Sequence, residues 1–322
     1  MTGRLEKETA FYAKLDEKLK GAPPVMREFC NWMRANRMSY NTIKDYTNKV
    51  LHFIRFVNLG DDFYKKVTIE DVEAYMISLQ TRQTSSGLQR TGDDILQGRW
   101  SALNTFFNWL LNKNYIIENP IIKVNRPKNE TEHKVVYLNK QEIGKLIKAT
   151  ENNRSQILAL RDKTLISLAL ATGLRISALT NIDIQDIDFE NSVIKVIEKR
   201  QKIREIPIGE NTLNLLKEWI KERNNFFVGV DSDALFLSTH KNRMSYDAAE
   251  NCLTRCCKIA GIKRITPHKL RTSSACALAE KNIPVKAIAQ RLGHTRIETT
   301  MRYIDVFNED AQRATGVLDN LF

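Results

Sequence analysis

The chain has no long hydrophobic run. No apolar stretch in its 322 residues approaches the ~20 residues that a membrane-spanning helix needs. The first residues, Met1-Thr2-Gly3-Arg4-Leu5-Glu6, are charged and lack the apolar core of a signal peptide. No strongly basic amphipathic helix or lipidation motif is present either. We therefore expect a cytoplasmic protein without a membrane partner.

Cysteine is scarce, and its spacing matches no disulfide framework. An odd number of five cysteines is typical of reduced thiols in a cytoplasm. Cys252 and Cys256 lie one helical turn apart, which would permit a metal site. No second Cys or His pair follows at zinc-finger spacing, so we expect these two residues to pack a helix. The five are Cys30, Cys252, Cys256, Cys257 and Cys276.

The sequence also lacks the common signatures of metal and nucleotide sites. It contains no His-Glu-x-x-His motif, no Gly-x-x-x-x-Gly-Lys-Ser/Thr loop, and no clustered carboxylates placed to bind Mg²⁺. We therefore predict no metal and no other cofactor. Any chemistry on a phosphate would have to be carried by side chains alone.

Positive charge is abundant. The formal net charge is +12 and the isoelectric point is about 9.4, while 42% hydrophobic residues indicate a globular chain long enough for two domains. Residues 1–132 carry 20 Lys and Arg against 16 Asp and Glu, and the remainder carries 30 against 22. Both parts are basic, which favours a nucleic-acid partner contacted by two domains, and a place at the nucleoid.

The N-terminal part reads as helical. Residues 1–22 predict a polar helix, either an added arm or a helix that packs on a neighbouring protomer. Residues 23–122 predict a compact bundle of four or five helices, with apolar stripes that include Met26, Phe29 and Met33, and its basic charge would suit nucleic acid. Helices are expected at 71–79 and 99–111, and a loop is expected at Ser85-Ser86-Gly87. Four cations on polar faces could reach phosphates, although a solvated face is the default for any one of them: Lys44, Lys49, Arg90 and Arg99.

A polar strip with prolines separates this bundle from the rest. We place a linker at 123–134 and a second domain at 135–322. Its two alternating segments, 192–197 and 203–208, predict a hairpin with a basic tip, in which Lys202 and Arg204 are candidate DNA contacts. Helices are predicted at 139–149, 157–171, 210–223 and 245–260.

The stretch from Thr266 to Tyr303 places polar groups at helix ends. A helix should begin at Pro267, with His268 and Arg271 three residues apart on one face. The helix 285–292 should stop at Gly293, leaving His294 just beyond it. Thr295-Arg296-Ile297-Glu298 has the form of a capping box, which predicts a third helix that carries Tyr303. Such groups suit the handling of a phosphate.

Together these motifs resemble the tyrosine recombinase family, which includes phage integrases and Xer-like enzymes. The resemblance rests on Ala171-Thr172-Gly173-Leu174-Arg175-Ile176-Ser177, on a hairpin ending in Pro207, and on His268-x-x-Arg271, Leu-Gly-His294 and Tyr303. It spans roughly residues 25–315. It implies a mainly α fold with a small β-sheet, in which a SAM-like core-binding bundle precedes an α+β catalytic domain. The catalytic group that it implies is Arg175, Lys199, His268, Arg271, His294 and Tyr303.

Some positions depart from the family pattern or leave a choice open. Ala178 replaces a carboxylate usually found three residues after the first arginine, and Thr272 stands where a histidine often follows the second. The first change could loosen the support of Arg175. Lys202 lies close enough to Lys199 that either could be the hairpin lysine of the site.

The chemistry of these residue types supports the same assignment. Two guanidiniums can hold the non-bridging oxygens of a phosphodiester in bidentate fashion. A phenol has a pKa of ~10, so Tyr303 needs a base, and His268 is the best candidate. Lys199 could protonate the departing 5′ oxygen, while His294 would hydrogen-bond a phosphate oxygen or buttress the site.

The resemblance implies an enzyme that recombines duplex DNA at specific sites through a 3′-phosphotyrosine and a Holliday junction. It would act in integration or excision of a mobile element, or in Xer-type dimer resolution. The expected assembly is a homotetramer on two DNA sites, with the tail 308–322 docked on a neighbouring protomer and with a possible accessory directionality protein. Two alternatives remain at this stage: a type IB topoisomerase, and a DNA-binding regulator that does not cleave.

Overall fold

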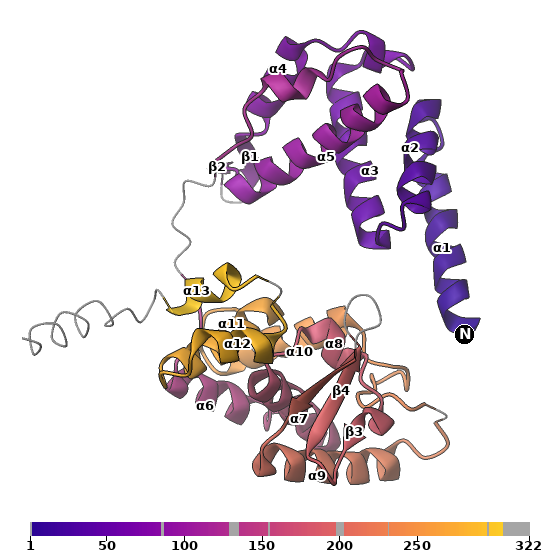
Figure 1. The fold of residues 1–322 in the computed structure, drawn as a ribbon. Helices are drawn as coiled ribbons and strands as arrows, with labels where there is room; N and C mark the ends of the chain where they lie inside the picture. Colours follow the sequence, from indigo (N-terminus) through magenta and orange to yellow (C-terminus); the bar gives the residue numbers. More distant parts are fainter. Residues whose placement is uncertain are drawn as a thin grey trace, which may run out of the picture. The chain divides into compact units, whose positions relative to one another are not determined.

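A computed structural model describes residues 2–84, 87–128, 135–153, 155–197, 203–230, 232–294 and 296–304. The chain divides into two compact units, Met1–His133 and Lys134–Phe322 (Figure 1). Within the described ranges no helix is long and apolar enough to cross a membrane.

The first unit is a helical bundle with an aromatic core. Phe29, Phe53 and Phe106 are fully buried, and the rings of Phe29 and Phe106 meet edge to face at 5.0 Å between centroids. Its elements are α1 (Thr2–Lys18), α2 (Pro24–Ala35), α3 (Tyr40–Val57), η1 (Phe63–Lys65), α4 (Ile69–Ser78), β1 (Thr81–Thr84), β2 (Gly87–Arg90), α5 (Asp93–Asn112) and η2 (Pro120–Lys123).

Capping residues explain why two of these helices begin earlier than predicted. α4 begins at Ile69 because Thr68 and Asp71 form a reciprocal capping box. α5 begins at Asp93, six residues before the predicted start, with Gly92 at the N-cap. Asp93 and Asp94 both lie in its first turn, where carboxylates interact favourably with the helix dipole.

Helix α1 packs on its own bundle. Leu15 and Leu19, at and just beyond the end of α1, are buried in the core of the first unit. Phe11 and Tyr12 contact the ring of Tyr40, with centroid distances of 5.1 and 5.9 Å. The helix predicted for residues 1–22 is thus anchored within its own unit by apolar contacts.

Two short strands interrupt the helical pattern of the first unit. β1 and β2 pair antiparallel, with Gln83 opposite Leu88 and Thr81 opposite Arg90. The prediction of helices alone for residues 23–122 is therefore wrong here. Apart from Leu88 and Gly87 the residues of these strands are polar, so the strands carry none of the alternating hydrophobicity by which a strand is recognised in a sequence.

The second unit is mainly helical with a small antiparallel sheet in the order β3-β4-β5, which confirms the predicted fold class. Trp219 lies in its core, where Nε1 donates to Leu235 O at 3.0 Å. The elements are α6 (Lys140–Ala149), α7 (Gln156–Thr172), α8 (Ile176–Thr180), η3 (Ile184–Asp186), β3 (Ile187–Asp188), β4 (Val193–Ile197), β5 (Ile203–Pro207), α9 (Glu210–Phe226), α10 (Tyr246–Ile259), α11 (Pro267–Ala279), α12 (Val285–Leu292) and α13 (Glu298–Ile304).

The cysteines contribute to packing. All five are free and buried. Cys252 and Cys256 lie on α10 and face the core of the second unit, as a helix-packing role requires. Beside them, the buried carboxylate of Asp162 accepts hydrogen bonds from Arg161 and Arg255, so this charge is paired from two sides.

Candidate active site

The first predicted arginine lies in a tight turn between α7 and α8. Gly173 ends α7 with φ +63°, in the left-handed region, and Arg175 is the exposed N-cap residue of α8. A Cβ at Gly173 would lie only 2.4 Å from Leu292 Cδ2. Only glycine therefore allows this turn to pack so closely against the end of α12.

Arg271 connects the separate segments of the site. Its side chain is 2% exposed, and it projects from α11. Nη1 donates to Gly173 O at 2.8 Å, and Nη2 donates to Leu292 O at 2.7 Å. These two carbonyls lie two residues before Arg175 and two residues before His294. One guanidinium thus fixes the turns that carry the other two site residues.

His268 lies in the first turn of α11, which begins at Pro267 as predicted. Its side chain reaches the surface of the second unit. The pKa of His268 is lowered, first by partial burial of the ring and then by the positive charges of Arg271, Lys269 and Arg175. A neutral imidazole at this position can accept a proton at neutral pH.

His294 follows the end of α12, which stops at Gly293 with φ +69°, as predicted. Its backbone N–H donates to Ala289 O at 3.0 Å, a bond that closes the helix end. Ring Nδ1 lies 2.8 Å from the hydroxyl of the buried Thr300. Burial, followed by the charges of Arg271 and Arg175, lowers the pKa of His294 to about 4. With Nδ1 held by Thr300, the other ring nitrogen is the one left for a ligand.

Tyr303 is carried by α13 and lies beside His294. The two ring centroids are 6.2 Å apart. The tyrosine is 7% exposed, and it packs among residues of α11 and α12 that include Cys276 and Leu292. α13 begins at Glu298, two residues later than a capping box at 295–298 would give, and Thr295 itself lies outside the described residues.

The predicted hairpin lysines, Lys199 and Lys202, lie outside the described residues. The strands that lead to them are β4 and β5, which pair from Val193↔Pro207 to Ile197↔Ile203. Ile197 is 70% exposed and Ile203 is 64% exposed. This end of the hairpin is therefore carried away from the core.

Two further arginines support the site and were not predicted to do so. Arg204, on β5, donates from Nη1 to Arg291 O at 2.6 Å and to Gln290 O at 3.2 Å. Arg291 in turn donates from Nη2 to Ala171 O at 2.6 Å. Burial, and then the charge of Arg204, lowers the pKa of Arg291. Arg204, predicted as a DNA contact, is thus placed on the last carbonyls of α12, and it joins the sheet to the site.

The two departures from the family pattern have simple structural settings. Thr272 is buried, and its hydroxyl donates to His268 O at 3.1 Å, within α11. Ala178 is half-buried and packs on the core of the second unit. An alanine at this position cannot hydrogen-bond the guanidinium of Arg175.

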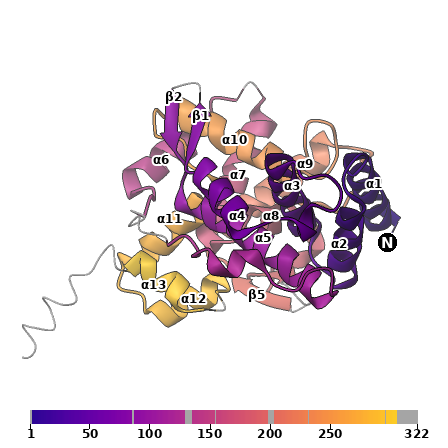
Figure 2. The same ribbon diagram turned by 90° about the horizontal axis from the view of Figure 1, so that it is seen from above.

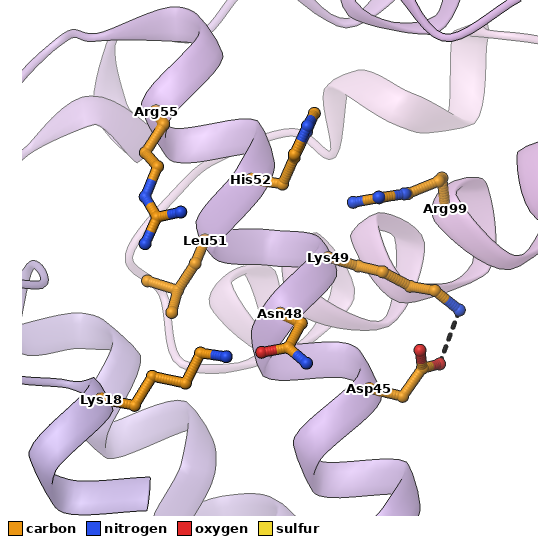
Figure 3. A pocket seen from close by; sticks show the side chains of 8 residues that line it. All are labelled: Lys18, Asp45, Asn48, Lys49, Leu51, His52, Arg55 and Arg99. Atoms are coloured by element: carbon orange, nitrogen blue, oxygen red, sulfur yellow. Dashed lines mark hydrogen bonds and ion pairs between the residues drawn. The ribbon is translucent and has the colours of Figure 1, made fainter. Parts of the chain in front are cut away.

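In the first unit, Arg99 lines a basic pocket of about 400 Å³ between α3 and α5 (Figure 3). Lys49 Nζ pairs with Asp45 Oδ2 at 2.6 Å. The hydroxyl of Tyr75 lies 3.0 Å from His52 Nδ1 and accepts from Arg99 Nη1 at 3.5 Å. Partial burial and then the charge of Arg99 lower the pKa of His52. The pocket residues are Lys18, Asp45, Asn48, Lys49, Leu51, His52, Arg55 and Arg99.

The other two predicted contacts of the first unit lie outside this pocket. Lys44 is exposed on α3, one residue before Asp45. Arg90 ends β2 and lies 3.7 Å from the carboxylate of Asp93. Lys44 and Arg90 are thus open to solvent, whereas Arg99 is half-buried.

The chain matches two family descriptions. Residues 136–310 match the phage integrase family, and residues 25–117 match the phage integrase N-terminal SAM-like domain. Among curated relatives, the "Tyrosine recombinase XerC" of Alcanivorax borkumensis is 30% identical over 284 residues, covering 88% of each chain. The protein of that name from Escherichia coli O157:H7 (strain EC4115 / EHEC) is 34% identical over 226 residues, covering 69% of this chain and 72% of its own.

Solved structures agree on the fold. The XerH site-specific recombinase in a post-cleavage complex with difH aligns with a TM-score of 0.73 at 20% identity, covering 97% of this chain and 89% of its own. The Tn1549 transposon integrase with circular intermediate DNA aligns with a TM-score of 0.70 at 22% identity, covering 90% of this chain and 98% of its own. The family matches and the sequence relatives together show that this chain belongs to the phage integrase family of tyrosine recombinases.

Proposed function

We propose that this chain cuts and rejoins duplex DNA at specific sites, with Tyr303 as the nucleophile. The observation that carries the proposal is the pair of hydrogen bonds from Arg271, which hold the turns of Arg175 and His294 around one guanidinium. Its XerC relatives, named tyrosine recombinases, support the same activity.

The cleavage step follows from the chemistry of these groups. The Tyr303 oxygen attacks the phosphorus, and the bond from phosphorus to the 5′ oxygen breaks, which leaves a 3′-phosphotyrosine and a 5′-hydroxyl. Arg175 and Arg271 neutralise the non-bridging oxygens as charge builds on them. His294 hydrogen-bonds the same phosphate group, with its ring oriented by Thr300.

Two proton transfers complete this step. His268 accepts the phenolic proton, and its lowered pKa keeps the imidazole neutral and able to do so near pH 7. Lys199 donates a proton to the departing 5′ oxygen, a role that the neighbouring Lys202 could also fill. Attack of another strand's 5′-hydroxyl on the phosphotyrosine then releases Tyr303 and joins the strands.

Recombination needs several copies of the chain on two DNA sites. We place the core-binding domain at 23–122, the linker at 123–134 and the catalytic domain at 135–322, with Lys49 and Arg99 of the basic pocket contacting the DNA backbone.

A groove of about 520 Å³ on the second unit, lined by residues that include Leu278, Ile283 and Ala287, would receive the apolar tail of a neighbouring copy. Leu318, Leu321 and Phe322 supply the apolar residues of that tail. A tetramer that exchanges strands through a Holliday junction is the working unit.

The experiment is capture of a covalent protein–DNA adduct. The full chain is incubated with nicked duplexes made from the DNA that flanks its gene, and denaturing gels separate adducts from free protein. The wild type and Tyr246→Phe, a control at an exposed tyrosine, should form the adduct. Tyr303→Phe should bind the same DNA and form none. Adducts that persist in Tyr303→Phe would overturn the assignment, and relaxation of plasmids without target sites would favour a topoisomerase.

A further inference from the structure

The β1–β2 hairpin projects from the first unit. Its base is closed where Thr91 N–H donates to Gln80 O at 2.7 Å, and Thr91 is buried. Beyond that point Leu88 is 69% exposed and the Arg90 side chain 77% exposed. In Figure 2 the two strands lie side by side and extend away from the helices of this unit. No described residue of either strand belongs to the core of the unit.

Such a hairpin gains little stability from packing. A two-stranded hairpin without a core beneath it is marginally stable in water. An aliphatic side chain exposed near its tip adds nothing to the fold. The arrangement is therefore better explained by contact with a partner than by a structural role.

The side chains of the hairpin suit a groove of DNA. Residues 81–84 are Thr-Arg-Gln-Thr and residues 87–90 are Gly-Leu-Gln-Arg, with two cations and no carboxylate. Gln83 and Leu88 are register partners and therefore share one face. A glutamine amide can bond the N6 and N7 atoms of adenine, and an apolar side chain contacts the methyl group of thymine.

The hairpin also lies close to the basic pocket. β2 leads through Thr91 and Gly92 into α5, so the hairpin lies at the N-terminal end of that helix (Figure 1). Arg99 of the pocket follows Asp93 by six residues, or about 9 Å along the helix axis. The base of the hairpin and the pocket are therefore carried by the same end of one helix, near enough for both to reach one stretch of duplex.

We propose that the β1–β2 hairpin enters the major groove and reads an A·T base pair, with Gln83 bonding the adenine and Leu88 contacting the thymine methyl. A two-stranded ribbon fits this groove. Arg90 anchors the hairpin on a phosphate. Its side chain is 77% exposed and lies 3.7 Å from the buried carboxylate of Asp93, which is too long for a hydrogen bond that would hold it in place. This inference rests on the proposed DNA-cleaving function and adds a residue pair that determines target specificity.

The test is selection of binding sites from a randomised duplex library with the full chain. The wild type should select an A·T pair at one position next to the core site. Gln83→Ala should relax that preference by about 5- to 150-fold without changing the other positions. Arg90→Ala should weaken all sequences alike, and Gln141→Ala, an exposed glutamine of α6, should change nothing.

A chemical probe separates the two contacts. Replacing the selected thymine by uracil removes only its methyl group, which should weaken the wild type and leave Leu88→Ala unaffected. An unchanged selection profile in Gln83→Ala, or equal sensitivity of both proteins to uracil, would overturn the proposal. Adduct formation on the selected duplex is scored in parallel. If the wild type forms adducts but Gln83→Ala keeps the wild-type selection profile, only the proposal for the hairpin is rejected. If the wild type selects a site but forms no adduct on it, the cleavage function is rejected.

Discussion

The two units of this protein use their positive charges differently. In the second unit Arg271, Arg204 and Arg291 donate to backbone carbonyls at the ends of α7 and α12. In the first unit Lys49 and Arg99 contact side chains, the carboxylate of Asp45 and the hydroxyl of Tyr75. The arginines near the candidate active site therefore also hold its fold together, whereas Lys49 and Arg99 can be removed without loss of a hydrogen bond to the backbone.

The largest difference between the units is expected on removing one arginine from each. Arg271→Ala leaves the carbonyls of Gly173 and Leu292 without their donor. The free energy of unfolding should fall by about 1–3 kcal/mol for each of these buried groups. Arg99→Ala should lower the free energy of unfolding by less than about 1 kcal/mol, because the hydrogen bond from Arg99 to the Tyr75 hydroxyl is long, at 3.5 Å. Urea unfolding of both variants checks this. Equal losses would remove the distinction between the units.

A glycine from each unit should respond to alanine with opposite sign. Gly173→Ala would place a Cβ 2.4 Å from Leu292 at a residue with positive φ. The free energy of unfolding should therefore fall by about 1–3 kcal/mol. Gly98 lies inside α5, and its Cβ would meet only the flexible end of Lys49, at 2.9 Å. Gly98→Ala should therefore stabilise by up to about 1 kcal/mol through helix propensity. Thermal unfolding of Gly173→Ala and Gly98→Ala measures the sign of each change in stability. A stabilised Gly173→Ala would refute the packing argument.

The pH dependence of stability tests the environment of His294. Its pKa in the folded chain, about 4, is below the ordinary 6.5, so the unfolded chain binds more protons between these values. The contribution of His294 to the free energy of unfolding is therefore complete above pH 6.5 and is lost as the pH falls toward 4. His294→Gln should flatten this pH dependence in denaturant unfolding, and an unchanged pH dependence in this variant would contradict the argument.

The smallest effect is expected on the salt dependence of DNA binding. Lys49→Ala should reduce the slope of log K against log salt by about 0.9, the value for one phosphate contact in duplex DNA. Cleavage of DNA that is already bound should not change. Fluorescence anisotropy over a range of salt concentrations measures the slope. An unchanged slope would show that Lys49, at the rim of the basic pocket, does not contact a phosphate.

Much of the second unit could be predicted because its signals are local. Pro267 begins α11 and Gly293 ends α12 as predicted, since a fixed φ and a left-handed φ are properties of single residues. The motif 171–177 likewise contains the glycine that ends α7, and Arg175 follows it as the N-cap residue of α8. The roles of the site residues remain predictions.

Other features could not be predicted because they depend on contacts between distant segments. Arg204 reaches carbonyls 86 and 87 residues away, and Arg291 reaches one 120 residues away. No spacing in the sequence marks such bonds. The position of Thr300 beside His294 requires the fold of α13 onto α12. The β1–β2 hairpin was missed because its strands are short and polar.

The most direct test of the central claim is a crystal structure of Tyr303→Phe bound to a nicked target duplex. In that structure Arg175, His268, Arg271 and His294 should all lie within hydrogen-bond distance of one phosphate, while Arg271 keeps its bonds to Gly173 and Leu292. A scissile phosphate that lies away from Arg271, with the guanidinium bonded to carbonyls alone, would contradict the claim.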